Sequence, residues 1–255
     1  MPRLRLLCGR GPVAGRGRCA PRRCIMSSDP ETARLIERQM RNWELARAQA
    51  EASPRPPDHV VEDFVCISYA WGSGGDEIAQ GVARRLGWPI FDRHLLQEMA
   101  RGDDIRQRLY ESMDERDLHW FEEYVRAFFE RDFDRNDYFH RLTTTILALA
   151  RKGRAVFLGR GCDLILPREL GFRVRIVAPR ACCVARYARV HGCDERAAAE
   201  RVDLVEHERR EFVLHHFGAR ADDPTRFDLI LNAESFPLDA AANLILSART
   251  LRGRS

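Results

Sequence analysis

Lysine is nearly absent from this chain of 255 residues. Lys152 is its only lysine, so arginine supplies almost all of the positive charge. Any lysine-dependent mechanism must therefore use Lys152, which follows a helical segment and is placed where a cation simply offsets a helix dipole. The sequence also has no run of 18 apolar residues, which excludes a membrane-spanning helix, and we expect no membrane partner.

The charge is unevenly distributed along the chain. Residues 1–25 contain seven arginines and no acid, and removing their +7 from the net charge of +4 leaves −3 for residues 26–255. The basic total therefore does not indicate a nucleic-acid partner. We predict that residues 1–28 are a disordered arginine-rich tail or lie upstream of a true start at Met26; an organelle presequence and a nucleic-acid-binding arm are the alternatives.

The eight cysteines do not form a recognisable framework. Their spacing lacks the paired C-x-x-C arms of a zinc site. Most of the five outside the tail stand in apolar or helical settings, which is typical of reduced thiols. We therefore expect a cytoplasmic protein.

The sequence lacks the complete residue patterns that metal sites and serine hydrolases require. His215 and His216 are adjacent on a predicted helix and cannot share a metal in the usual i, i+4 manner, so no metal-ligand set is predicted. No G-x-S-x-G elbow with a Ser-His-Asp arrangement is present. The acids of the same helical segment are expected to form a solvated face: Asp203, Glu206 and Glu208.

Short apolar runs alternate with helical segments in the second part of the chain. The first run is nearly continuous, which is typical of a strand buried on both faces. The alternation predicts an α/β fold, a three-layer αβα sandwich with a mainly parallel sheet. We expect strands at 64–68, 88–92, 155–159, 172–178 and 228–232, and helices at 76–86, 136–151, 180–190, 194–216 and 238–251.

Three further segments complete the predicted organisation. Residues 29–58 are expected to form an amphipathic helix and a proline-rich linker, and residues 59–255 a single domain. Within it, the charged and aromatic segment 102–140 predicts a helical insertion above the carboxyl ends of the strands. Its aromatic residues can pack as helix core or form a base-stacking lid.

A glycine-rich turn follows the first predicted strand and precedes a helix. It consists of Gly72, Ser73, Gly74 and Gly75. Backbone N–H groups at such a place favour phosphate, and the absence of Cβ atoms permits close approach of the anion. A tight turn without a ligand is the alternative.

The Walker A pattern G-x-x-x-x-G-K-[ST] is not met at this turn. Asp76 stands where its lysine would fall, and Glu77 stands roughly where its metal-binding hydroxyl would fall. Asp76 also places a negative charge where donor phosphates need a positive one. A Mg²⁺ ion could reverse this effect by recruiting Asp76 or Glu77 through water.

Five motifs, in order, resemble the cytidylate kinase-like family. "CISYAWGSGGDEIAQGVARRLGWPIFDRHLLQEMA" (66–100) resembles the family's first strand, turn and second strand, and "VFLGRGCDLILP" (156–167) resembles its V-G-R-G segment. Three others follow, at 172–179, 202–218 and 227–232. The resemblance implies the P-loop fold of nucleoside-monophosphate kinases. It also implies phosphoryl transfer from ATP, with Mg²⁺, to CMP or a related small acceptor.

The resemblance assigns roles to particular residues. The turn of residues 72–75 would cradle the donor phosphates. Asp92 would lie at the acceptor site, and Arg160 would grip the acceptor phosphate. Arg186 and Arg209 would gather over the transferring phosphoryl group, Arg209 from a mobile lid, because guanidinium groups neutralise equatorial oxygens well. Ordinary surface arginines are the alternative, least so for Arg160.

The chain also departs from the family pattern. Family members usually carry arginine where Tyr69 and Asp76 stand, and often where Cys183 stands. These departures support a second hypothesis, a catalytically impaired relative that binds a nucleotide and acts as a regulatory or interaction protein. A nucleic-acid adaptor that uses the arginine-rich tail is the third.

Overall fold

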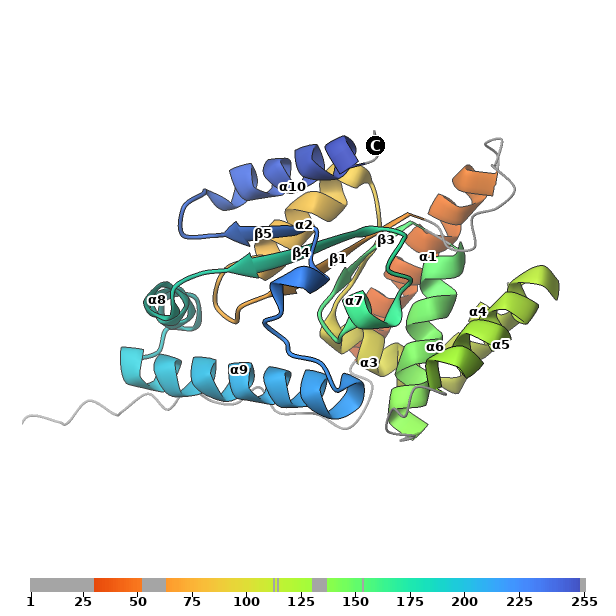
Figure 1. The fold of residues 1–255 in the computed structure, drawn as a ribbon, viewed down its shortest axis with the longest axis horizontal. Helices are drawn as coiled ribbons and strands as arrows, with labels where there is room; N and C mark the ends of the chain where they lie inside the picture. The colour runs from red at the N-terminus through yellow and green to blue at the C-terminus, as the bar shows by residue number, and fades with distance from the viewer. Residues whose placement is uncertain are drawn as a thin grey trace, which may run out of the picture.

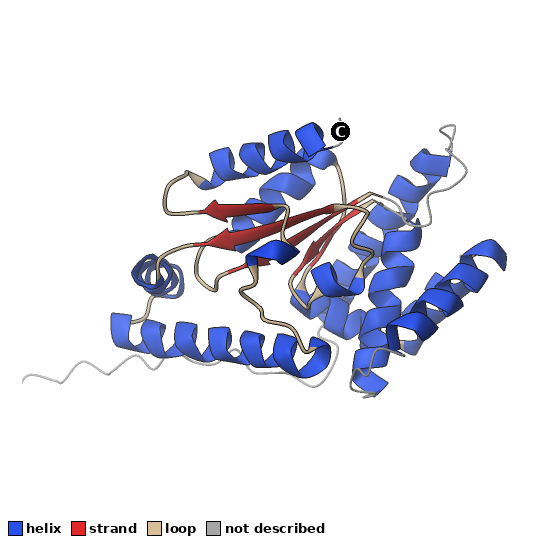
Figure 2. Ribbon diagram, in the orientation of Figure 1, coloured by secondary structure: helices blue, strands red, loops and turns tan. Residues whose placement is uncertain are grey.

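Five strands run in the same direction and form one parallel sheet. The computed structural model describes residues 30–51, 63–111, 113, 115–129, 137–152 and 154–252, so the predicted tail and most of the predicted linker lie outside it. The strand order is β2-β3-β1-β4-β5 (Figures 1 and 2). The strands are β1 (Phe64–Tyr69), β2 (Ile90–Phe91), β3 (Ala155–Leu158), β4 (Phe172–Val177) and β5 (Leu229–Asn232).

The predicted apolar runs become the strands of this sheet. β1 lies at its centre, where Cys66 pairs with Phe157 on one side and with Arg173 on the other. The second run is shorter than predicted, because Pro89 has no N–H to donate and only Ile90 and Phe91 pair with β3. The α/β fold with a parallel sheet is confirmed.

Helices cover both faces of the sheet. α2 and α10 pack together on one face, and α3, α6 and α7 lie on the other (Figure 1). α8 and α9 pack against each other beyond the ends of β4 and β5. The bounds are α1 (Pro30–Glu51), α2 (Gly75–Leu86), α3 (Arg93–Arg101), α4 (Asp103–Glu111), α5 (Glu115–Phe129), α6 (Asp137–Lys152), α7 (Cys162–Ile165), α8 (Arg180–His191), α9 (Glu195–Phe217), a short 3-10 helix (Pro224–Arg226) and α10 (Leu238–Arg252).

The predicted helical insertion contains α4 and α5. Both pack beside α6 (Figure 1). Phe121 and Phe128 are buried, and the ring of Phe128 contacts those of Phe139 and Phe217. These two aromatic residues are therefore helix core, and their burial against α6 draws the insertion to that side.

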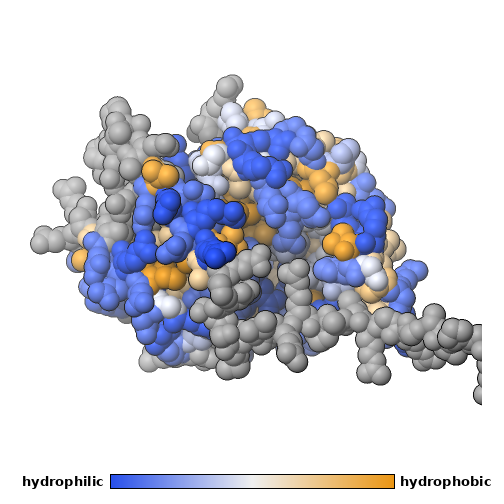
Figure 3. All heavy atoms as spheres, turned by 180° about the vertical axis from the view of Figure 1, so that it is seen from behind, coloured by the Kyte–Doolittle hydropathy of each residue, from blue (hydrophilic) through white to orange (hydrophobic). Residues whose placement is uncertain are grey.

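The molecular surface is mostly hydrophilic on the face shown in Figure 3, where hydrophobic residues form small separate patches. Within the described ranges, no helix has the length and apolar character needed to cross a membrane.

The topology places a switch point at the carboxyl end of β1. The chain leaves this central strand toward β2 on one edge, and later strands are added on the opposite side as β4 and β5. In open parallel sheets, ligands bind outside the carboxyl ends of the strands where the connections change direction. The glycine-rich turn follows β1 directly at this point.

One fully buried arginine fastens the loop after α7 to the sheet. Arg173, on β4, has no exposed surface, and its backbone N–H donates to the carboxylate of Asp228 at 2.7 Å. Its guanidinium donates to backbone carbonyls that follow or end α7: Asp163, Leu166, Pro167, Arg168 and Leu170. One side chain therefore satisfies carbonyls that the short helix leaves unpaired.

We predict that Arg173→Met lowers the free energy of unfolding by about 3 kcal/mol or more, because buried carbonyls lose their donors. Urea unfolding of the purified chain measures the change. Arg196→Met is the control, since Arg196 is exposed and forms only a 4.0 Å ion pair with Glu200, and its loss should cost about 0.5 kcal/mol or less. An equal effect of both substitutions would contradict this account of Arg173.

Candidate phosphate-binding site

The glycine-rich turn is closely packed against α8. Gly72 and Gly74 have left-handed backbones, with φ of 85° and 86°. A Cβ atom on Gly72 would lie 2.4 Å from the carbonyl oxygen of Cys183, and one on Gly74 would lie 2.8 Å from Nη1 of Arg186. Glycine is therefore needed at both positions for conformation and for space.

This turn presents a row of backbone donors. In the described part of the chain, no acceptor is found for the N–H groups of Gly72, Gly74, Gly75, Asp76 and Glu77. The hydroxyl of Ser73 is also buried without a hydrogen-bond partner. Unpaired N–H groups at the start of a helix form an anion site, and the helix dipole adds to it.

A carboxylate already occupies one donor of the turn. The N–H of Trp71 donates to Oε1 of Glu206, on α9, at 2.7 Å. The prediction that Glu206 belongs to a solvated face is therefore wrong, because α9 crosses the turn and brings this side chain down to 22% exposure. The other two predicted acids, Asp203 and Glu208, do lie in exposed positions. The N–H of Trp71 is therefore already paired with a negatively charged group.

Arg209 fastens α9 to the same turn. Its Nη1 donates to the carbonyl oxygen of Tyr69 at 2.7 Å and lies 3.6 Å from the carboxylate of Glu206. Its guanidinium carbon lies 4.4 Å from the ring centre of Tyr69 and 4.8 Å from that of Trp71. Cation–π contact with two rings holds the charge of Arg209 over the turn.

Tyr69 and Asp76, which stand where arginines were expected, pair with each other. The Tyr69 hydroxyl donates to Oδ1 of Asp76 at 2.7 Å. Burial raises the pKa of the Asp76 carboxyl, whereas this hydrogen bond and the charge of Arg209 lower it. Burial also raises the pKa of the Tyr69 hydroxyl, so the tyrosine remains the donor.

Arg186 reaches the turn from α8. Its Nη1 lies 3.9 Å from Glu77 Oε1, and the side chain lies against Gly74. The structure therefore brings Arg186 and Arg209 together at the turn.

Arg160 lies in a strained turn after β3. Its φ of 56° makes it the one non-glycine residue with a left-handed backbone within the described ranges. Nη2 donates to Gln97 Oε1 at 2.8 Å, the guanidinium lies 5.1 Å from the ring centre of Phe212, and Nε is buried without a partner. Burial, with a smaller contribution from Arg209, lowers the pKa of Arg160 to about 10. Strain of this kind is typical of functional positions.

The sequence analysis missed Arg175 on β4. Its Nη1 donates to the Ser68 hydroxyl at 2.7 Å, and burial lowers its pKa. The charge of Glu206 raises this pKa, and the charge of Arg209 lowers it. A signal was present: Arg173 and Arg175 share one face of an otherwise apolar strand.

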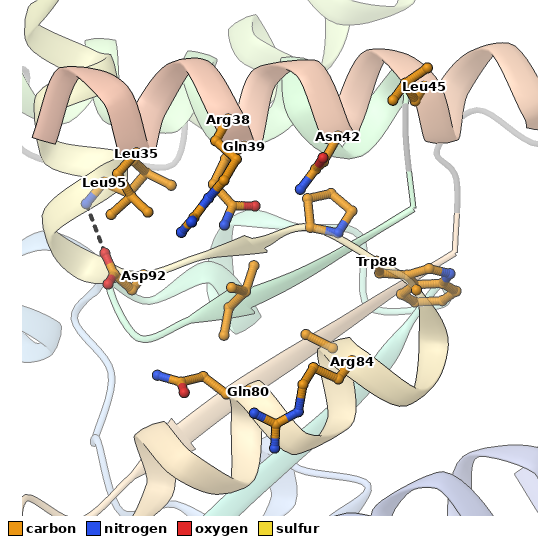
Figure 4. Close-up of a pocket in the computed structure, with 14 residues that line it drawn as sticks. Leu35, Arg38, Gln39, Asn42, Leu45, Gln80, Arg84, Trp88, Asp92 and Leu95 are labelled. Carbon is orange, nitrogen blue, oxygen red and sulfur yellow. Dashed lines mark hydrogen bonds between the residues drawn. The ribbon is translucent and has the colours of Figure 1, made fainter. Parts of the chain in front are cut away.

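Asp92 lies at the end of β2, further from the turn. Its Oδ1 accepts the N–H of Leu95 at 2.8 Å and caps α3 (Figure 4). Its charge makes a small contribution that raises the pKa of Asp76.

Comparison with known proteins identifies the family. The profile of the cytidylate kinase-like family matches residues 64–235, more than half of the chain. The chain belongs to this family. Membership of a kinase-like family supports phosphoryl transfer as the general class of chemistry. No match was found among curated proteins.

Solved structures support the fold of this cytidylate kinase-like chain. An uncharacterized protein from Eubacterium ventriosum is 20% identical, with a TM-score of 0.59 over 73% of this chain and 97% of that one. Shikimate kinase from Bacteroides thetaiotaomicron is 13% identical, with a TM-score of 0.41 over 72% of this chain and 96% of its own. The first likeness shows the fold alone, and the second is too weak for any conclusion.

The residues of this kinase-like site fit a nucleotide phosphate better than a metal bound by protein alone. The free N–H groups and the buried Ser73 hydroxyl suit an anion. No cluster of three metal-ligating side chains occurs among the residues that the structure describes. Mg²⁺ commonly binds through substrate phosphates and one or two carboxylates, and Asp76 and Glu77 are the carboxylates that directly follow the turn.

We predict that Asp76→Asn raises the free energy of unfolding at pH 7. Asparagine still accepts the Tyr69 hydroxyl but avoids burying a charge. The folded-state pKa of Asp76 is raised because the charged carboxylate is unfavourable when buried. The loss of folding free energy caused by this charge is therefore fully present above the folded-state pKa and absent below the ordinary value of 3.8. Thermal unfolding from pH 3.5 to 8 should therefore show a gain that disappears as the pH falls. A gain that is independent of pH would contradict this origin.

Proposed function

We propose that this cytidylate kinase-like protein transfers the γ-phosphoryl group of ATP to a nucleoside monophosphate, CMP or a related small acceptor. The observation that carries the proposal is the row of unpaired N–H groups at the glycine-rich turn, beside a donor that already binds the carboxylate of Glu206. The bond between the γ-phosphorus and its bridging oxygen breaks, and a bond to an acceptor phosphate oxygen forms. The products are ADP and a nucleoside diphosphate.

In this proposal, arginines replace the missing Walker A lysine. Arg186 lies over the turn from α8, and Arg209 lies over it from α9. Arg160 and Arg175 approach from the ends of β3 and from β4. Phosphoryl transfer depends on positioning and on neutralising the equatorial oxygens, and planar guanidinium groups do both.

The acceptor is proposed to bind between Asp92 and Arg160. Arg160 supports this because its buried Nε has no partner and is free to donate to a phosphate. ATP and Mg²⁺ are the proposed cofactors; the ion neutralises charge on the donor phosphates when it is bound. The cytoplasmic location stays a prediction.

A second candidate function is nucleotide binding without catalysis, in a regulatory or interaction protein. The Tyr69–Asp76 pair favours it, because a carboxylate stands beside the turn where family members usually carry arginine. Tight binding of an ATP analogue without phosphoryl transfer to any acceptor would favour this candidate. Activity restored by Asp76→Arg would show that the substitution caused the loss.

A coupled assay with ATP, Mg²⁺ and a panel of nucleoside monophosphates tests the first proposal. We expect turnover with CMP or a related acceptor, and a fall of about tenfold or more in kcat/KM for Arg160→Met and for Arg175→Met, because each loses a charged hydrogen bond to phosphate. Arg180→Met should leave kcat/KM unchanged, because Arg180 is exposed and pairs with Asp203. Absence of turnover with every acceptor would overturn the proposal.

We further predict that Glu206→Ala and Glu206→Gln bind pyrophosphate about fivefold more tightly than the unmodified chain, because each removes a competing carboxylate charge from the turn. Isothermal titration calorimetry measures the affinity. Glu208→Gln is the matched control, two residues along the same helix and exposed, and should have no effect. Unchanged or weaker binding in both Glu206 variants would show that this side chain does not compete with the anion.

A further inference from the structure

A groove runs along the free edge of the sheet, apart from the glycine-rich turn. Its floor is β2, and its walls are α1 and α2 (Figure 4). The volume is about 700 Å³, within the range of sites for small molecules. α1 lies outside the family match at residues 64–235, so the groove combines the family domain with an element that the match does not include.

The groove has an unsatisfied polar side chain in its wall. Gln39, on α1, is only 8% exposed, and its Oε1 is buried without a hydrogen-bond partner. Figure 4 shows this side chain directed from α1 toward β2. Leaving a buried carbonyl unpaired is unfavourable, and a ligand that donates a hydrogen bond would remove that penalty.

The remaining polar groups define the chemistry of the ligand. Asn42 on α1 and Gln80 on α2 add two more amides, and Arg38 and Arg84 add a guanidinium on each wall. No hydrogen bond or ion pair occupies these four side chains within the described ranges. Amides suit the edge of a heterocyclic base, and guanidinium groups suit phosphate or carboxylate.

An indole lies at one end of the groove and a carboxylate at the other. Trp88 lines the groove, and Arg249 lies 4.8 Å from its ring centre. Aromatic rings provide flat apolar contact for a planar ligand. Asp92 at the opposite end also belongs to the proposed acceptor site. The groove therefore adjoins that site, but the arginines of the site do not line the groove.

We propose that this groove binds a mononucleotide-sized anion, with a planar heterocycle at the amide side chains and an acidic group at Arg38 and Arg84. The groove shares Asp92 with the proposed acceptor site but is distinct from it, because Arg160, Arg175 and Arg209 do not line the groove. A ligand bound there contacts α1 and Asp92 together. Occupancy would therefore link the N-terminal helix to the acceptor end of β2.

Calorimetric titration of the full chain with AMP, CMP, GMP, UMP and inorganic phosphate tests the groove. The Arg160→Met variant is used as background, which weakens the proposed acceptor site and leaves the groove intact. We expect at least one nucleotide to bind with a stoichiometry near one, and more tightly than phosphate. Arg38→Ala or Gln39→Leu, added to this background, should weaken that binding about tenfold.

Matched variants separate the possible results. Arg41→Ala changes an exposed arginine on α1 that does not line the groove, and should leave the affinity unchanged. Gln39→Leu places an apolar side chain of similar size there and removes the unpaired carbonyl, so loss of binding with an unaltered or raised melting temperature supports the site. No nucleotide binding, binding insensitive to the groove variants, or phosphate binding as tight as any nucleotide would each overturn the proposal. None of these results depends on phosphoryl transfer.

Discussion

The contact between α9 and the glycine-rich turn is the interaction on which the site depends. Arg209 lies against two aromatic rings and donates to the carbonyl of Tyr69, while Glu206 accepts the N–H of Trp71. These contacts hold α9 over the carboxyl end of β1. They also place a positive and a negative side chain at the same turn. A phosphate that binds at this turn must compete with the carboxylate of Glu206 and is attracted by the guanidinium of Arg209.

The distribution of charge around the turn differs from what the scarcity of lysine suggested. Residues 72–75 of the turn have no ionisable side chain, and the two residues that follow, Asp76 and Glu77, are acids. The guanidinium groups come from elements further along the chain: α8, α9, β4 and the loop after β3. Tyr69 and Asp76 satisfy each other by a hydrogen bond, so the loss of arginine at both positions leaves no unpaired group between them. The positive charge near the turn therefore comes from arginines on these neighbouring elements.

Local patterns in the sequence predicted most of the fold and part of the site. The apolar runs predicted all five strands because a central parallel sheet is buried on both faces. The strand after Pro89 is three residues shorter than predicted, and each of the others differs by one residue at one end. The glycine-rich turn was recognisable because backbone conformation restricts its residues. Contacts over long sequence distances were not predictable: Glu206 was assigned to a solvated face, although its partner Trp71 lies 135 residues away. For the insertion, the pattern of Phe121 and Phe128 indicated burial but did not specify α6 as the neighbour.

The left-handed backbone of Arg160 has a consequence for how this chain can change. Its neighbours Gly159 and Gly161 adopt the same region without cost, whereas an arginine there costs about 1 kcal/mol or more. Replacement by glycine would relax the turn and strengthen the fold, yet it would remove the guanidinium. The contacts of this guanidinium with Gln97 and Phe212 would be lost with it, so backbone relaxation and side-chain contacts oppose each other at this one position.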